Sequence, residues 1–293
     1  MGKLTVDDYR SLVSKVDKLV EGGARDAGKV LMVLRAIENH PDFFELLGGG
    51  EVLGRLSVGN VVSDRLTPIR SLILSPDQQI EAWAKANKKF EGSRIPKTAF
   101  KVLDSLPVPA LTPEDVVDGY LGPALFYGFG GKDNMSNMIL SAKVPLEYIA
   151  STRVTWKWKC ADFNNPKALR PFVGVHSERP MGFYWKLVHL GHKHQGIPVK
   201  EARRLISQSD WGMGPEGIQF FLTHPHCAEL VNGVDIPYMD LPDFEAVSPY
   251  WIDLSQKFAR ALCVGFDGDS GKLVLFGSSV SSSDPGSGSG TLR

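Results

Sequence analysis

The sequence changes character near residue 120, and this change constrains the fold more than any other feature. Before it, apolar residues recur at helical spacing, and two segments open with helix-capping residues, Ser75-Pro76-Asp77-Gln78 and Thr112-Pro113-Glu114-Asp115. After it, glycine, aromatic and β-branched residues become frequent, as is typical of strands. The pattern predicts an α+β protein in which a helical N-terminal part precedes a mostly antiparallel sheet with helices. No regular alternation of strand and helix argues for a parallel sheet.

Breaks in the pattern suggest how the chain is divided. Prolines and glycines concentrate between the helical region and the strand-rich region, at Pro107, Pro109, Gly119 and Gly122. We therefore expect a helical part over residues 1–110 and an α+β domain over residues 120–283. Residues 284–293 are rich in glycine and serine and are expected to form a flexible tail, because few apolar side chains are available to offset the entropy of ordering. Truncation after Ser283 should then change the melting temperature by no more than about a degree.

Several individual elements can be expected after residue 120. The segment 154–160 alternates apolar and polar residues and predicts a strand. A hairpin is predicted around Asp267-Gly268-Asp269-Ser270-Gly271, and the proline-rich stretch 233–250 is expected to be mainly loop. Further strands are expected at 171–175 and 182–190, and helices at 199–207 and 215–222.

Composition excludes some classes of protein. The 293 residues carry 33 Lys+Arg and 33 Asp+Glu, so the formal net charge is zero. Nucleic-acid binders usually carry a basic excess, whereas zero net charge gives weak repulsion between copies and favours self-association. No apolar run approaches the ~18 residues that would span a bilayer. Three dispersed cysteines and an N-terminus without an apolar leader favour a cytoplasmic protein that is not in a membrane.

Two groups of histidines are the best candidate for metal binding. His192, His194, His224 and His226 could supply the four ligands of a tetrahedral zinc ion if the two pairs met in space. The spacing matches no named zinc motif, and Pro225 constrains the second pair. Loop histidines in solvent are the favoured interpretation, and no cofactor is expected in that case.

Other candidate sites are incomplete. One glycine-rich run ends in lysine, Gly128-Phe129-Gly130-Gly131-Lys132-Asp133. It lacks the serine or threonine of a phosphate-binding loop and is interpreted as a loop or linker. Asp267 and Asp269 begin like a calcium loop but lack the closing glutamate, so a turn is expected. A strand with Trp156 and Trp158 on one face and lysines on the other is expected to turn its aromatic face to the core. Four acids in the proline-rich stretch are interpreted as a solvated acidic loop: Asp235, Asp240, Asp243 and Glu245.

One region resembles known families. Three segments carry the likeness. They are, in chain order, Gly214-Pro215-Glu216-Gly217-Ile218-Gln219-Phe220-Phe221-Leu222-Thr223-His224-Pro225, Ile236-Pro237-Tyr238 and Phe276-Gly277-Ser278-Ser279-Val280-Ser281. This order resembles uncharacterised bacterial domain families with an E-G-x-x-F-x-L-x-H-P segment and a terminal G-S-x-S element. The likeness covers about the last 70–80 residues, and the closing element lacks the cysteine of the family pattern. These families have no established activity, so the resemblance implies no residue roles.

These observations lead to one main hypothesis and two alternatives. The main hypothesis is a non-enzymatic binding or assembly module whose partner is a protein, with self-association included, because no complete catalytic constellation is present. The first alternative is a zinc-dependent hydrolase that uses the two histidine groups. The second is a nucleic-acid accessory protein that uses the basic strand between Arg153 and Lys159.

Overall fold

The computed structural model describes residues 66–90, 94–150, 169–172, 178–206, 210–246, 260–269 and 271–293. The chain divides into two compact units, residues 1–62 and 63–293, and all of the described residues belong to the second. Their helices and mainly antiparallel sheets confirm the α+β class. The strand expected at 154–160 lies outside the described residues.

The described helices are most frequent in the first half of the unit's sequence, and further helices lie between the later strands. In chain order they are α5 (Pro76–Asn87), α6 (Lys97–Lys101), η2 (Leu103–Ser105), α7 (Pro113–Asp118), α8 (Asn134–Ala150), η3 (His192–His194), α9 (Val199–Leu205), α10 (Pro215–Thr223) and η4 (Pro225–Leu230). The predicted capping boxes are confirmed: Ser75 caps α5 together with Gln78, and Thr112 caps α7 together with Asp115.

The strands of the described residues form two sheets. In chain order they are β1 (Gly122–Gly128), β2 (Leu169–Pro171), β3 (Gly182–His189), β4 (Trp211–Gly212), β5 (Tyr238–Ala246), β6 (Arg260–Asp267), β7 (Lys272–Ser279), β8 (Ser287–Ser289) and β9 (Thr291–Leu292). One sheet has the order β1-β3-β9-β4 and is antiparallel throughout. The other has the order β2-β5-β6-β7, with β8 parallel to β5. The predicted hairpin is confirmed as β6 and β7, in which Asp267 pairs with Lys272.

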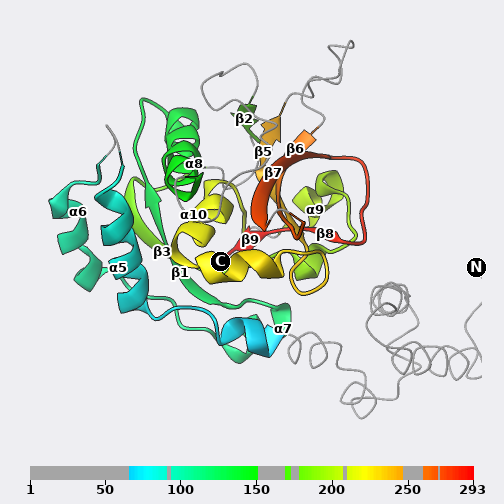
Figure 1. The fold of residues 1–293 in the computed structure, drawn as a ribbon, viewed down its shortest axis with the longest axis horizontal. Coiled ribbons are helices and arrows are strands. Elements are labelled where there is room, and N and C mark those ends of the chain that lie inside the picture. The colour runs from blue at the N-terminus through cyan, green and yellow to red at the C-terminus, as the bar shows by residue number, and fades with distance from the viewer. Residues whose placement is uncertain are drawn as a thin grey trace, which may run out of the picture. The chain divides into compact units, whose positions relative to one another are not determined.

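Helix α10 lies at the centre of the unit, and every one of its residues is buried. It contacts α5, α8 and β1, and it also contacts β5 of the second sheet (Figure 1). A helix that is buried on all sides requires such surroundings, because its apolar side chains must be kept from water and its few polar ones need partners inside the fold. The core therefore runs through α10 and includes Ile218, Phe220 and Phe221.

Two buried glutamines complete the hydrogen bonding of strand β1, whose other edge pairs with β3. The side chain of Gln79 accepts from the Leu125 amide at 2.8 Å and donates to the Pro123 carbonyl at 3.0 Å. Gln219 of α10 accepts from the Tyr127 amide at 2.8 Å and donates to the Tyr127 carbonyl at 2.9 Å. Each side-chain amide thus takes the place of a neighbouring strand, which joins the two helices to the sheet.

The last ten residues differ from the expected flexible tail. Residues 287–292 form β8 and β9, and all of them are buried. Strand β9 lies between β3 and β4, so the red end of the chain returns to the middle of the fold (Figure 1). Glycine and serine suit this position because the main chains of Gly191 and Gly288 pass in close contact. The composition reflects close packing here rather than disorder.

Two further expectations differ from the structure. The stretch expected to be loop at 233–250 contains the buried strand β5, with Pro242 at an irregularity where the register with β6 shifts between Leu241 and Ala246. The division expected at 110–120 is absent from the described residues around it, because α5 packs against β1 and the Asp115 carboxylate of α7 pairs with Arg293.

Candidate functional site

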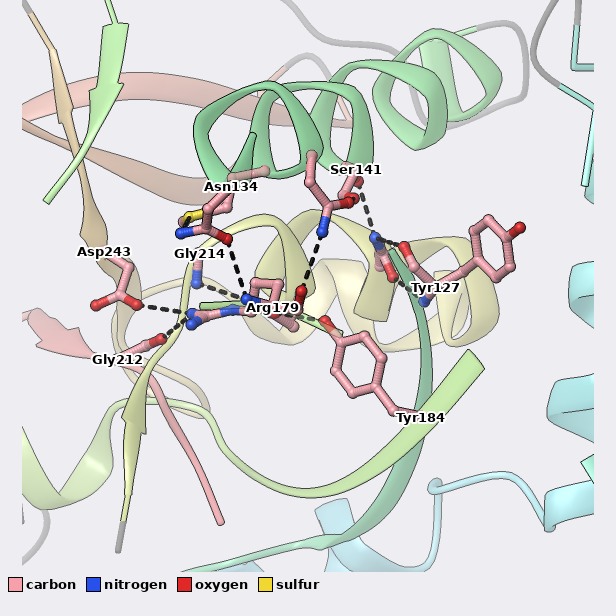
Figure 2. Close-up of polar contacts among 12 residues, drawn as sticks. Tyr127, Asn134, Ser141, Arg179, Tyr184, Gly212, Gly214 and Asp243 are labelled. Atoms are coloured by element: carbon pink, nitrogen blue, oxygen red, sulfur yellow. Dashed lines mark hydrogen bonds and ion pairs between the residues drawn. The ribbon is translucent and has the colours of Figure 1, made fainter. Parts of the chain in front are cut away.

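Arg179 is the centre of the most extensive buried polar network in the described part of the chain. It precedes β3, and its side chain is 0% exposed. Nε donates to Glu216 Oε1 at 2.6 Å, and Nη2 donates to Asp243 Oδ2 at 2.7 Å and to the Gly212 carbonyl at 2.7 Å (Figure 2). We call Arg179, Glu216 and Asp243 the Arg179 network. It connects α10, β5 and the chain entering β3.

Glu216 satisfies its two carboxylate oxygens with three donors. It lies in the first turn of α10, where a carboxylate also interacts favourably with the helix dipole. Besides Arg179, the Tyr184 hydroxyl donates to Oε1 at 2.7 Å, and the Gly214 amide donates to Oε2 at 3.0 Å. Burial raises the pKa of Tyr184 well above its ordinary value, so the phenol stays protonated and acts as a donor.

The network holds one cation against two carboxylates. Burial by itself would lower the pKa of Arg179, but the charges of Glu216 and Asp243 outweigh this effect and raise it. Burial raises the pKa of Asp243 to about 6, although Arg179 opposes the shift. The guanidinium therefore keeps its charge, and burial makes Asp243 easier to protonate than an aspartate in solvent.

Helix α8 fixes the backbone around Arg179. The Arg179 amide donates to Asn134 Oδ1 at 3.1 Å, and Asn137 Nδ2 donates to the Arg179 carbonyl at 3.1 Å (Figure 2). Asn137 Oδ1 also accepts from the Gly130 amide at 3.0 Å. The first turn of α8 therefore holds two loops at once, the one that follows β1 and the one that enters β3.

Two methionines are exposed beside these contacts, one on the loop that enters β3 and one in the first turn of α8. Met181 lies two residues after Arg179 and is 75% exposed, and Met135 lies beside Asn134 and is 41% exposed. The Met181 sulfur lies close to Gly130, where an added Cβ would be 3.4 Å from it. We call Gly130, Met135 and Met181 the methionine surface. It presents adaptable apolar side chains on a backbone that side-chain hydrogen bonds hold in place.

The glycine-rich run begins with the last residue of β1, Gly128, and residues 129–133 form the loop between β1 and α8, as expected. The Phe129 amide donates to Ser141 Oγ at 3.1 Å, and the Gly130 amide donates to Asn137. These two amides point to α8 side chains, which is a different arrangement from a loop that surrounds a phosphate group with its amides.

The second histidine pair holds the turn before α5. His224 Nε2 accepts from the Leu74 amide at 3.1 Å, and its ring stacks on Phe220 with centroids 4.5 Å apart. Burial lowers the pKa of His224 to about 3, which keeps the ring neutral and leaves Nε2 able to accept. His226 Nε2 donates to the Leu72 carbonyl at 2.7 Å. The expectation of a solvated loop residue is wrong for His224, which is 0% exposed.

The first histidine pair lies on η3. His192 Nε2 donates to the Asp235 carbonyl at 2.9 Å. His194 is buried, with its ring 6.4 Å from that of His189, so the expectation of a solvated histidine is wrong for it as well. Within the described ranges, which include all four histidines, no three or more His, Cys, Asp or Glu side chains are grouped to hold a metal ion. The structure brings together His224 with His226, at 6.0 Å between ring centroids. Zinc binding stays a prediction.

The expectation of a solvated acidic loop is wrong for three of its four acids. Asp240, Asp243 and Glu245 are buried on β5, whereas Asp235 is exposed. Glu245 pairs with Arg170 at 2.7 Å and with Arg203 at 3.3 Å. These arginines lie 75 and 42 residues away in the sequence, so no local pattern indicated them.

Cys227 beside His226 does not provide a reactive thiolate. The side chain is buried, and burial raises the pKa of its thiol to about 12. A thiol that stays protonated at neutral pH is a poor nucleophile.

Sequence reasoning missed the residues on which the site depends. Arg179, Asn134, Asn137 and Met181 were not identified from the sequence as site residues, and Glu216 was named only as part of the family-like segment. The one usable signal was a glutamate in a mainly apolar helix, because a buried carboxylate requires a cation or several donors.

Comparison of the chain with family models, curated proteins and solved structures gave no match. In the part of the chain that the structure describes, every helix is too short or too polar to cross a bilayer.

Proposed function

We propose that this protein is a non-enzymatic protein-binding module that contacts its partner through the methionine surface. The observation that carries the proposal is Met181, which is 75% exposed on a backbone that α8 side chains hold at Arg179. Exposed apolar side chains that stand singly are common on protein surfaces. This one differs because it follows Arg179 by two residues and its sulfur lies near Gly130, while a second exposed methionine, Met135, follows Asn134, which accepts from the Arg179 amide.

A fixed backbone favours binding. Association costs less when the contacting loop is already ordered, because less conformational entropy is lost when the partner binds. Asn134 and Asn137 provide this order by bonding to the Arg179 backbone, and the buried Arg179 guanidinium adds to it by bonding to Glu216. The methionine side chains remain adaptable, and such side chains are enriched at protein interfaces.

The chemistry of the network supports binding over catalysis. Its charged groups are 0–11% exposed at the side chain and contact one another, so they are placed to hold the loops. A partner would meet the exposed methionine surface and not these buried charged groups. The complementary partner is therefore a protein with an exposed apolar side chain, and a second copy of this chain is one such protein.

Site-specific photocrosslinking tests the proposal. A photoreactive amino acid placed at position 181 should capture a discrete partner protein in cells that produce the full chain. The control is position 234, because Val234 is 78% exposed on another loop and matches Met181 in accessibility. The same adduct should be absent from a position-181 probe chain that also carries Met135→Glu.

Equal adducts from positions 181 and 234 would contradict the proposal, because capture would then follow accessibility alone. Mass spectrometry of the adduct also distinguishes a different protein from a second copy of this chain.

A further inference from the structure

Residues 287–293 occupy a position between strands in the manner of a bound peptide. Strand β9 pairs with β3 through Leu292 and Val188, and with β4 through Leu292 and Trp211. Strand β8 pairs with β5, from Tyr238 to Asp240. We call β3, β4 and β5 the acceptor strands. This short segment thus supplies one strand to each sheet, β9 to the first and β8 to the second.

The acceptor strands select the sequence of this segment. Leu292 is fully buried, and an added Cβ at Gly288 would overlap the main chain of Gly191. Recognition thus combines main-chain pairing with particular positions for a leucine and a glycine.

Arg293 adds a charged contact beyond the strand. Its guanidinium donates to Asp210 at 2.8 Å, to Asp115 at 2.7 Å and to Asp118 at 3.0 Å. It also lies 4.6 Å from the centre of the Tyr120 ring. Three carboxylates and an aromatic face suit a guanidinium particularly well.

The connection from β7 to this segment is exposed. Residues 281–285 are all exposed, in contrast to the buried residues on the segment itself. Two of the hydrogen bonds here are local, from the Gly286 and Ser287 amides to Asp284. An exposed connection of serine, aspartate and proline can take another path without disturbing either sheet.

We propose that residues 287–293 are an exchangeable strand, and that the acceptor strands also receive this strand from a second copy of the chain. Every contact of the segment would recur unchanged between two copies, and only the exposed connection would differ. The zero net charge adds no long-range repulsion between the copies. This inference is independent of the methionine surface, which lies on other loops.

A pair of cysteines tests exchange directly. Val188 and Leu292 are paired across β3 and β9, and the amide and carbonyl of Leu187 bond to those of Arg293, so 188 and 292 form the closer, non-hydrogen-bonded type of pair. One chain carries Val188→Cys and another carries Leu292→Cys. The two full-length proteins are mixed and oxidised, and the 188–292 disulfide is sought by peptide mass spectrometry.

The expected result is a 188–292 disulfide between the two chains, with a yield that rises severalfold when residues 281–284 are deleted, because a shorter connection hinders return to the same copy. The disulfide should persist with Met181→Glu, which separates exchange from association through the methionine surface. The double variant Val188→Cys, Leu292→Cys in one chain is the control. The proposal would be overturned if the double variant forms the disulfide within one chain but no mixture of the two single-cysteine chains, with or without the deletion, forms it between chains.

Discussion

The main chains of Gly191 and Gly288 pass each other in direct contact. A Cβ added to Gly191 would lie 2.6 Å from the Gly288 carbonyl oxygen, and a Cβ added to Gly288 would overlap the Gly191 carbonyl. Gly191 also has a φ of 98°, a backbone conformation that residues other than glycine rarely adopt. This crossing lets residues 287–292 enter the interior, so a glycine-serine sequence becomes part of the core.

Gly288→Ala should destabilise the protein by about 2–3 kcal/mol, because the added methyl group meets backbone that cannot move independently. The matched control is Gly286→Ala, where the nearest atom to an added Cβ is a side-chain oxygen at 3.4 Å. That change should stay within about 0.5 kcal/mol. Urea unfolding of both variants gives the comparison, and equal effects would contradict the crossing.

Truncation after Ser283 should destabilise the protein strongly. It removes β8, β9, the buried Leu292 and the ion pairs of Arg293. A loss of at least about 5 kcal/mol is expected, which corresponds to a fall in melting temperature of roughly 10 °C or more. A melting temperature within about a degree of the full chain would instead support the flexible tail that composition suggested.

Arg179→Ala should cost about 3–5 kcal/mol, because Glu216 and Asp243 would remain buried without their cation. Arg204→Ala serves as control, since Arg204 pairs with Glu201 at the surface, with 66% of its side chain exposed. That variant should change the free energy of unfolding by about 0.5 kcal/mol or less. A similar small value for Arg179→Ala, measured by denaturant unfolding, would exclude a structural role for the network.

His224 should make the protein sensitive to mild acid. Its folded pKa is about 3 and its ordinary value is 6.5, so the unfolded chain binds a proton that the folded chain excludes. This stability is fully present above pH 6.5 and is lost as the pH falls toward 3. Between pH 6.5 and 5 the wild type should lose about 2 kcal/mol more than His224→Gln.

The comparison with His224→Gln is necessary because buried acids act in the opposite direction. Burial raises the pKa of Asp240 and of Asp243 to about 6, so these groups add stability as the pH falls from 6 toward 3.8. Parallel pH profiles for the wild type and His224→Gln would show that the histidine does not titrate as its burial predicts.

Local signals were sufficient for several elements. Ser75 with Gln78 and Thr112 with Asp115 define helix starts through contacts three residues apart, and both starts are confirmed. The hairpin of β6 and β7 likewise follows from a turn between two apolar runs. Such features depend on neighbours in the sequence and can be predicted from it.

The site depends on distant partners and could not be predicted in the same way. Asp243 was expected to be in solvent because it lies in a proline-rich stretch interpreted as a loop, yet its partner Arg179 lies 64 residues away. The same holds for residues 284–293, whose acceptor strands come from three other parts of the chain. Burial of such groups is a property of the assembled fold.

Contact between Met181 and a partner protein is tested most directly by binding affinity. The affinity of the captured partner is measured for the wild-type chain and for two variants. Isothermal titration calorimetry should compare the wild type with Met181→Glu and with Val234→Glu, which alters a side chain of similar exposure, 78% against 75%. We expect Met181→Glu to weaken binding by about tenfold or more, since a charge would be buried against an apolar surface. Val234→Glu should leave the affinity within about twofold. Equal affinities for all three chains would contradict the claim.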